Sequence, residues 1–152
     1  MKLLHNAKIT LFVKPEDKTS LADYEKIFKK LAPLDFEKEK LSVKTEIVEG
    51  LEGRKIKILS LELSKESHTN TFIKTLKDLI GLEACKTIEG QKESRLDEEL
   101  FFYIRLDRKK ALENEFELTD SGECIHIKLS LAAFPKNKES ALKLVEKIFL
   151  GK

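Results

Sequence analysis

The sequence has no tryptophan and only two cysteines, three prolines and six glycines among its 152 residues. Cys85 and Cys124 belong to no C-x-x-C pair, which excludes a disulfide framework and the usual ligand spacing of a structural zinc site. We expect both to be free thiols in a reducing compartment. No repeat, low-complexity tract or long linker divides the chain, so we expect a single domain over residues 1–152.

Long apolar runs are missing as well. No window approaches the roughly 18 consecutive apolar residues of a membrane span, and polar residues interrupt the amino terminus before a signal peptide would be complete. We therefore expect a cytoplasmic protein without a membrane partner.

Recognised catalytic motifs are absent. The sequence contains no phosphate-binding or dinucleotide-binding glycine pattern, no zinc-protease motif and no nucleophile elbow. Cys124 and His126 share one strand face, but two ligands are too few for zinc. The acids at 97–99 could hold Mg²⁺ or act as acid and base, but no nucleophile or phosphate loop accompanies them. We predict a protein that is not an enzyme and that has no cofactor or metal.

An excess of charge of one sign is also lacking, because 29 Lys and Arg stand against 27 Asp and Glu, for a net charge of +2. This balance excludes a strong global attraction to nucleic acid. Any affinity for RNA must come from local clusters of cations.

Alternating and helical spacings of apolar residues predict an α+β fold. The predicted elements are a strand at 8–14, a helix at 20–32, strands at 41–47 and 56–63, a helix at 67–80, a strand at 100–107, a helical turn at 108–113, strands at 115–119 and 123–132, and a last helix after Asn137. The polar stretch 89–98 is predicted to be a mobile loop. Gly50 and Gly53 predict a hairpin between 41–47 and 56–63, and residues 120–122 predict a second one between 115–119 and 123–132. Because the order β-α-β-β-α-β-β-β-α favours hairpins, we expect a mostly antiparallel sheet with helices on one face.

The strand faces turned away from those helices combine cations with aromatic rings. They carry Lys8, Thr10, Phe12, Lys14, Ser42, Lys44, Phe101, Tyr103, Arg105, His126, Lys128 and Ser130. Such a face suits single-stranded nucleic acid, because rings stack on bases and cations meet phosphates. The same rings would also form an apolar patch that another helix or a subunit covers, as large exposed apolar patches usually mark an interface, and a shifted register would turn each set to the other side.

Two short basic clusters are candidates for phosphate contacts. One comprises Arg54, Lys55 and Lys57, and the other comprises Arg105, Arg108, Lys109 and Lys110. Cations on loops can bind the phosphate backbone of a nucleic acid without recognising its base sequence. In a chain this rich in lysine and glutamate, such runs are also typical of ordinary solvated surface.

Three segments resemble an archaeal family of small proteins described as predicted RNA-binding subunits of the exosome, with an architecture like that of ribosomal protein L5. The segments are 13–17, 49–56 and 100–111, the last of which has a hydrophobic strand ending in Arg105-Leu106-Asp107-Arg108 before an alanine-containing turn. The hairpin turn departs from the family pattern, since Leu51, Glu52, Arg54 and Lys55 replace its histidine and Asn-Pro pair.

The resemblance implies an L5-like fold and an accessory role in the exosome or in RNA processing. With the pattern above, it predicts that RNA is contacted by Arg54, Lys55, Lys57, Phe101, Tyr103, Arg105, Arg108, Lys109 and Lys110. The expected partners are RNA and a homodimer or larger RNA-processing complex. The alternative is an interaction protein that pairs through the open sheet face and has no role with nucleic acid.

Overall fold

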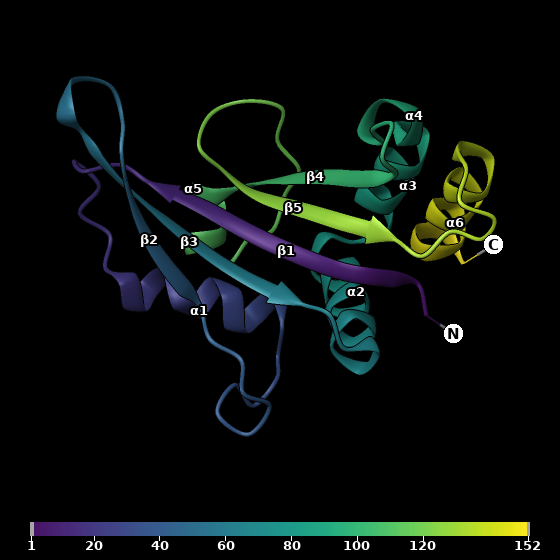
Figure 1. Ribbon diagram of the computed structural model, residues 1–152, viewed down its shortest axis with the longest axis horizontal. Coiled ribbons are helices and arrows are strands. Elements are labelled where there is room, and N and C mark those ends of the chain that lie inside the picture. The colour runs from purple at the N-terminus through teal and green to yellow at the C-terminus, as the bar shows by residue number, and fades with distance from the viewer. Residues whose placement is uncertain (1, 152) are drawn as a thin grey trace.

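A five-stranded sheet forms the centre of the computed structural model, which describes residues 2–151 (Figure 1). The strands are β1 (Leu4–Val13), β2 (Lys44–Glu49), β3 (Lys55–Leu63), β4 (Phe101–Asp107) and β5 (Cys124–Leu131). Their spatial order is β2-β3-β1-β5-β4, and every neighbouring pair is antiparallel. The predicted α+β class with an antiparallel sheet is therefore confirmed.

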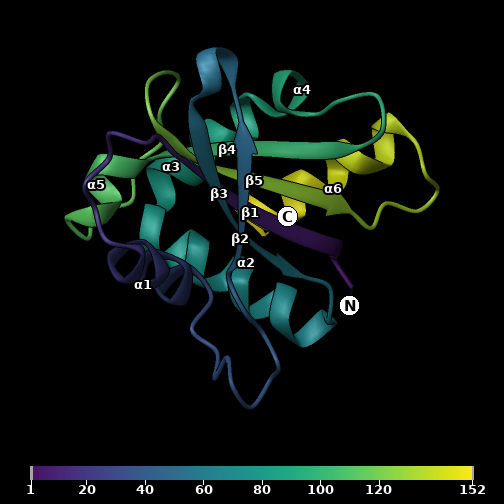
Figure 2. The same cartoon turned by 60° about the vertical axis from the view of Figure 1, so that its left-hand side comes forward.

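Six α-helices and one short 3-10 turn accompany the strands in this part of the chain. They are α1 (Leu21–Leu31), η1 (Leu51–Gly53), α2 (Glu66–Ile80), α3 (Leu82–Gly90), α4 (Lys92–Arg95), α5 (Arg108–Leu112) and α6 (Lys138–Leu150). Figure 2 shows the strands passing in front of α2, α3 and α6. Within residues 2–151, no helix combines the length and the apolar character that crossing a membrane requires.

The hydrophobic core lies between the helices and one face of the sheet. Alternate residues of β1, β3, β4 and β5 are buried there, among them Ile9, Leu11, Leu59, Leu61, Phe102, Ile104, Ile127 and Leu129. Helices contribute Phe28, Phe72, Ile88 and Phe149 to the same cluster. Burying each such side chain stabilises the fold by about 1.5 to 3 kcal/mol. Because the strand residues in between point the other way, the second face of the sheet carries none of this core.

Helix boundaries follow the capping residues that the sequence provides. Ser20 caps α1, where its hydroxyl accepts a hydrogen bond from the backbone N–H of Asp23 at 3.1 Å. Asn137 caps α6 in the same way, through a 2.9 Å hydrogen bond from the N–H of Ser140. Gly81, with φ of 88°, separates α2 from α3 in a conformation that favours glycine.

The prediction of a mobile loop at 89–98 is wrong. Residues 82–90 form α3, where Cys85 and Ile88 are buried against the core, and residues 92–95 form α4. An ion pair between Lys92 and Glu89 spans the junction. The polar composition that suggests a loop reflects short helices with only a narrow buried stripe.

The predicted hairpin between 115–119 and 123–132 is also wrong, because β5 uses its two edges for β1 and β4. The segment 115–119 instead runs along the outer edge of β4, where the N–H of Thr119 donates to Arg105 O at 3.1 Å. A single bridge joins Leu118 to Leu106. The β-propensity of its residues predicts that segment 115–119 is extended, but it does not identify the strand with which the segment pairs.

The predicted hairpin of β2 and β3 is present and projects past the helices, so all six residues of β2 are exposed. Its turn uses positive φ at Gly53 (71°) and at Glu52 (60°), whereas Gly50 has φ of −91°. The expected buried face of β2 is therefore absent, and Ile47 keeps 63% of its surface exposed.

Candidate nucleic-acid interface

The face of the sheet opposite the core is uncovered over β1, β5 and β4. We call this surface the open face and define it by Lys8, Thr10, Phe12, Phe101, Tyr103, Arg105, His126 and Lys128. Strand register aligns these side chains in rows, with Lys8 opposite Lys128 and Lys128 opposite Tyr103. The next row joins Thr10, His126 and Arg105. The structure therefore brings together cations and rings from three strands.

Three aromatic rings of the open face differ in their availability. Phe12 is 45% exposed and meets the His126 ring edge-on, with 5.3 Å between centroids. Tyr103 is 38% exposed. Phe101 is half-buried, and Lys128 Nζ lies 4.1 Å from its ring centroid in a cation–π contact. Phe12 and Tyr103 thus offer more free ring surface for stacking than Phe101 does.

The Tyr103 ring is held in place through its hydroxyl, which donates to Asp97 Oδ2 at 2.8 Å. Partial burial, followed by this hydrogen bond, raises the pKa of Tyr103, so the phenol stays protonated at neutral pH. Burial alone would raise the pKa of Asp97, but hydrogen bonds from the Phe101 N–H and the Tyr103 hydroxyl outweigh it and lower that pKa. The ring is therefore oriented before any ligand arrives.

The cations of the open face are lysines and one arginine. Burial, then the nearby Arg105, lowers the pKa of His126, so its imidazole is neutral at pH 7. Lys8 lies opposite Lys128 on one side and opposite Glu62 of β3 on the other. The positive charge is thus concentrated toward β5 and β4 and is offset at β3.

Cys124 and His126 approach each other without forming a reactive pair. Cys124 Sγ lies 3.3 Å from His126 Nε2. Burial raises the pKa of the Cys124 thiol, although Arg105 and Arg108 oppose the shift, while the pKa of His126 is lowered. These directions favour a neutral thiol beside a neutral imidazole, which is the reverse of an activated nucleophile. Among residues 2–151, no group of three or more His, Cys, Asp or Glu side chains is arranged to hold a metal ion.

The basic cluster at 105–110 is divided by the end of β4. Arg105 points to the open face, and Lys109 is exposed on α5. Lys110 is exposed, but its ammonium forms an ion pair with the Glu117 carboxylate and donates a hydrogen bond to it. This hydrogen bond is the main reason that the pKa of Lys110 is raised. Only part of this cluster therefore offers unpaired charge to solvent.

Arg108 lies inside the protein, with 3% of its surface exposed. Its guanidinium donates to Phe12 O at 2.5 Å and to the Glu123 carboxylate, and it lies 3.7 Å from Asp17 Oδ2. Its Cζ is also 5.6 Å from the Tyr24 ring centroid. Arg108 thus ties β1 and α1 to the start of β5, and we leave it out of the candidate interface.

The basic cluster at 54–57 belongs to a different side of the molecule. Arg54 forms a 2.5 Å ion pair with Glu16. Lys55 and Lys57 are exposed and alternate with Ile56 and Ile58, so they point to the side of β3 opposite Phe12. Both clusters lie at the same end of the sheet, but β1 and β5 separate them. They do not form one continuous basic surface with the open face.

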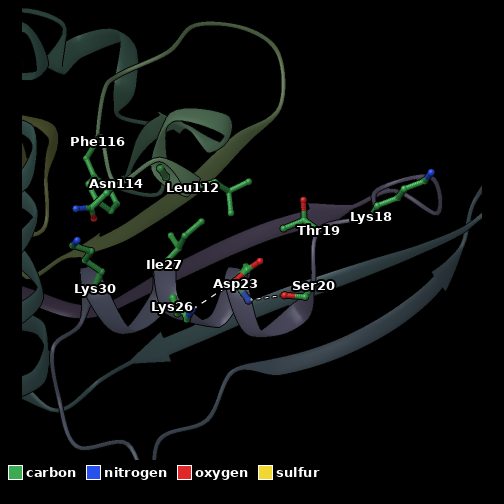
Figure 3. A pocket seen from close by; sticks show the side chains of 11 residues that line it. Lys18, Thr19, Ser20, Asp23, Lys26, Ile27, Lys30, Leu112, Asn114 and Phe116 are labelled. Carbon is green, nitrogen blue, oxygen red and sulfur yellow. Dashed lines mark hydrogen bonds and ion pairs between the residues drawn. The ribbon is translucent and has the colours of Figure 1, made fainter.

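A second basic surface lies on the helix side, between α1 and α5 (Figure 3). We call it the lysine groove: a pocket of about 830 Å³ with Lys18, Lys26 and Lys30 around it. Its apolar wall includes Ile27 and Phe116, which are 4% and 6% exposed. Lys26 is paired with Asp23 at 3.8 Å. The groove has cations but no exposed aromatic ring.

Lys8, Lys128 and Phe12 are absent from the set of RNA contacts predicted from sequence, although strand alternation puts them on the same face as Tyr103. The signal for them was therefore present in the period of two. What alternation could not give is the strand order, which decides that Lys128 stands between Lys8 and Tyr103.

Residues 8–131 match the family model described as RNA binding, and the chain belongs to this family. RNA-binding protein PAB1135 of Pyrococcus abyssi is 29% identical over 150 residues, covering 97% of this chain and 94% of that protein. Uncharacterized protein MJ0213 of Methanocaldococcus jannaschii is 26% identical over 152 residues, covering 98% and 99%. Both relatives are thus matched along nearly their whole length.

Solved structures from archaea have the same fold. Protein AF2318 from Archaeglobus fulgidus superposes with a TM-score of 0.81 at 25% identity, covering 95% of this chain and 99% of that chain. Mth689 from Methanothermobacter thermautotrophicus gives a TM-score of 0.75 at 24% identity, covering 97% and 98%. The fold of this chain is therefore that of these archaeal proteins.

Proposed function

We propose that this protein is a non-enzymatic module that binds single-stranded RNA through the open face. The observation that carries the proposal is the uncovered array in which Phe12 and Tyr103 lie among Lys8, Lys128 and Arg105. Membership of an RNA-binding family and a relative named as an RNA-binding protein support the same ligand.

The open face suits single strands better than duplexes. Bases of a single strand are free to stack on exposed rings, at about 1 to 3 kcal/mol per base, and stacking tolerates any base. In a duplex the bases are already stacked on one another, and recognition relies on groove shape and on phosphate and 2′-hydroxyl contacts. An array of rings on a sheet therefore favours unpaired nucleotides with little sequence preference.

The cations of the open face supply a modest electrostatic attraction. With a net charge of +2, the chain as a whole attracts RNA weakly. Lys8, Lys128 and Arg105 would each neutralise one phosphate, and each contact releases counterions from the strand. Exposed Lys109 extends this charge around the end of β4. Lys55 and Lys57 would engage a longer RNA that bends around β3, and Arg54 would join them if its pairing with Glu16 opens.

An accessory role in the archaeal exosome or in other RNA processing fits a small RNA-binding module, and it stays a prediction from resemblance. The same holds for the likeness to ribosomal protein L5. The competing function is protein pairing through the open face, which the exposed surface of Phe12 and Tyr103 would also suit.

Fluorescence anisotropy with a labelled 12-nucleotide single-stranded RNA, at 50 and 200 mM salt, tests the proposal. We expect binding at 50 mM that weakens at 200 mM, and a further loss in Tyr103→Asp, whose charge repels phosphate. Light scattering on the same variant separates the alternatives. If Tyr103→Asp breaks a stable dimer and neither form binds RNA, the open face serves protein pairing instead.

A further inference from the structure

A small pocket lies at the outer edge of β4, next to the open face. It measures about 310 Å³ and is formed by α4, by β4 and by the segment that follows Leu118. Arg95 and Arg105 both line it, and Tyr103 and Arg105 belong to the pocket and to the open face at once. If an RNA base stacks on Tyr103, the sugar-phosphate backbone of that nucleotide would therefore lie next to this pocket.

Arg95 is held rigidly by the residues around it. Its Nε and Nη2 donate to Gln91 Oε1 at 3.1 and 2.7 Å, and its Nη1 donates to Tyr103 O at 3.1 Å. These bonds fix the plane of the guanidinium beside the strand and leave two of its five N–H groups uncommitted. An oriented guanidinium loses little side-chain entropy when it binds an oxyanion.

Arg105 brings a second guanidinium to the same pocket. Within residues 2–151, its side chain has no hydrogen bond and no ion pair. Burial lowers the pKa of Arg95 and so does the nearby Arg105, while Asp120 acts in the opposite sense. Two cations facing one acid leave the pocket with a charge of +1, so an anion would relieve the repulsion between the arginines.

We propose that Arg95 and Arg105 form a phosphate-binding site that takes an internucleotide phosphate of the RNA whose base stacks on Tyr103. This inference rests on the proposed function and deepens it by naming the backbone contact. Guanidinium groups suit phosphate because their parallel N–H groups match two oxygens at once. Asp120 weakens the site, because its carboxylate competes with the phosphate for Arg95.

The presence of Asp120 gives a test in which one variant gains affinity. The probe is a labelled 12-nucleotide uridine RNA, measured by anisotropy against salt concentration. Arg95→Gln should weaken binding by about tenfold, as expected for hydrogen bonds to a charged group. The slope of log affinity against log salt should fall by about 0.7, the value for one phosphate of a single strand. Asp120→Asn should strengthen binding about twofold to fivefold, which a misfolded protein would not do.

Matched controls make the same change of charge elsewhere. Glu25→Gln, on the exposed side of α1, removes one acid as Asp120→Asn does, and Lys74→Gln, on α2, removes one cation as Arg95→Gln does. We expect each control to change the affinity less than twofold, because screening weakens charges beyond about 8 to 10 Å.

Two outcomes would overturn the site in distinguishable ways. If the wild type binds RNA and Tyr103→Ala weakens it, but Arg95→Gln and Asp120→Asn match their controls, the phosphate site is wrong while RNA binding stands. If the wild type binds no RNA at 50 mM salt, both proposals fall.

Competition with inorganic phosphate at constant ionic strength separates the two sources of phosphate. Failure of millimolar phosphate to displace the RNA supports an internucleotide phosphate. If phosphate binds the wild type but not Arg95→Gln, while Arg95→Gln leaves the RNA affinity unchanged, the site takes free phosphate and the internucleotide assignment is wrong.

Discussion

The open face and the lysine groove lie on different sides of the sheet, and both combine cations with apolar side chains. They differ in what those apolar side chains do. In the groove, Ile27 and Phe116 are almost fully buried and belong to the core. On the open face, Phe12 and Tyr103 keep much of their ring surface exposed. A basic surface attracts any polyanion, but only exposed rings can also stack on bases, so charge alone does not identify the candidate interface.

The largest effect is expected at a cation that belongs to neither surface. Arg108→Ala should lower the free energy of unfolding by about 3 kcal/mol, because it leaves the Phe12 carbonyl and the Glu123 and Asp17 carboxylates without their shared partner. Urea unfolding followed by circular dichroism measures this. Lys109→Ala, on the same helix, should change the stability by less than about 0.5 kcal/mol. Equal stability of both variants would contradict a structural role for Arg108.

The second-largest effect should come from removing the two exposed rings of the open face. The double substitution Phe12→Ala and Tyr103→Ala should cost about 1 to 3 kcal/mol of RNA-binding free energy for each stacked base. Leu112→Ala, in the wall of the lysine groove and also 38% exposed, is the matched control and should leave the affinity unchanged. Anisotropy titrations at one salt concentration suffice. If Leu112→Ala weakens binding as much as the loss of both rings does, exposed rings do not distinguish the open face from the lysine groove.

Charge removal should give a smaller effect with a distinct dependence on salt. Lys8→Ala combined with Lys128→Ala should reduce the slope of log affinity against log salt by about 1.4, or about 0.7 for each phosphate contact. Lys18→Ala combined with Lys30→Ala removes the same charge from the groove and should leave the slope as in the wild type. A slope that falls only in the groove variant would move the interface to the helix side.

The smallest effect concerns pH. Burial and Arg105 lower the pKa of His126, so the imidazole remains neutral between pH 8 and 7 and gains a proton only below its usual value of about 6.5. RNA affinity should therefore be flat from pH 8 to 7 and increase only under more acidic conditions, as a cation appears beside Phe12. His126→Gln should remove that increase. An affinity that rises between pH 8 and 7 in the wild type, but not in His126→Gln, would contradict the lowered pKa.

Local patterns predicted much of the fold, because alternation and capping act within a few residues. The strand predicted at 8–14, the helix beginning near Ser20 and the cap at Asn137 all follow from such short-range chemistry, although β1 begins earlier than predicted, at Leu4. Strand order does not, since it depends on contacts between distant segments. For this reason the sequence paired residues 115–119 with β5, whereas the structure has them along β4.

The candidate site shows the same limit. Alternation put Tyr103 and Arg105 on the face opposite the core, which the structure bears out. The basic sequence at 105–110 does not show that Arg108 is buried while its basic neighbours are exposed. The acidic partners of Arg108 are Asp17 and Glu123, which are distant from it in the sequence. Arg95 was missed because its segment was assigned to a loop, although it lies beside Tyr103 in the folded protein.

The location of RNA on the open face is tested most directly by backbone NMR during titration with a 12-nucleotide single-stranded RNA. Amide shifts should change along β1, β4 and β5, at Lys8, Phe12, Tyr103 and Lys128, while the amide shifts of Lys26 and Lys30 in α1 should stay unchanged. Shifts confined to α1 and α5 would contradict this expectation and assign the RNA to the lysine groove.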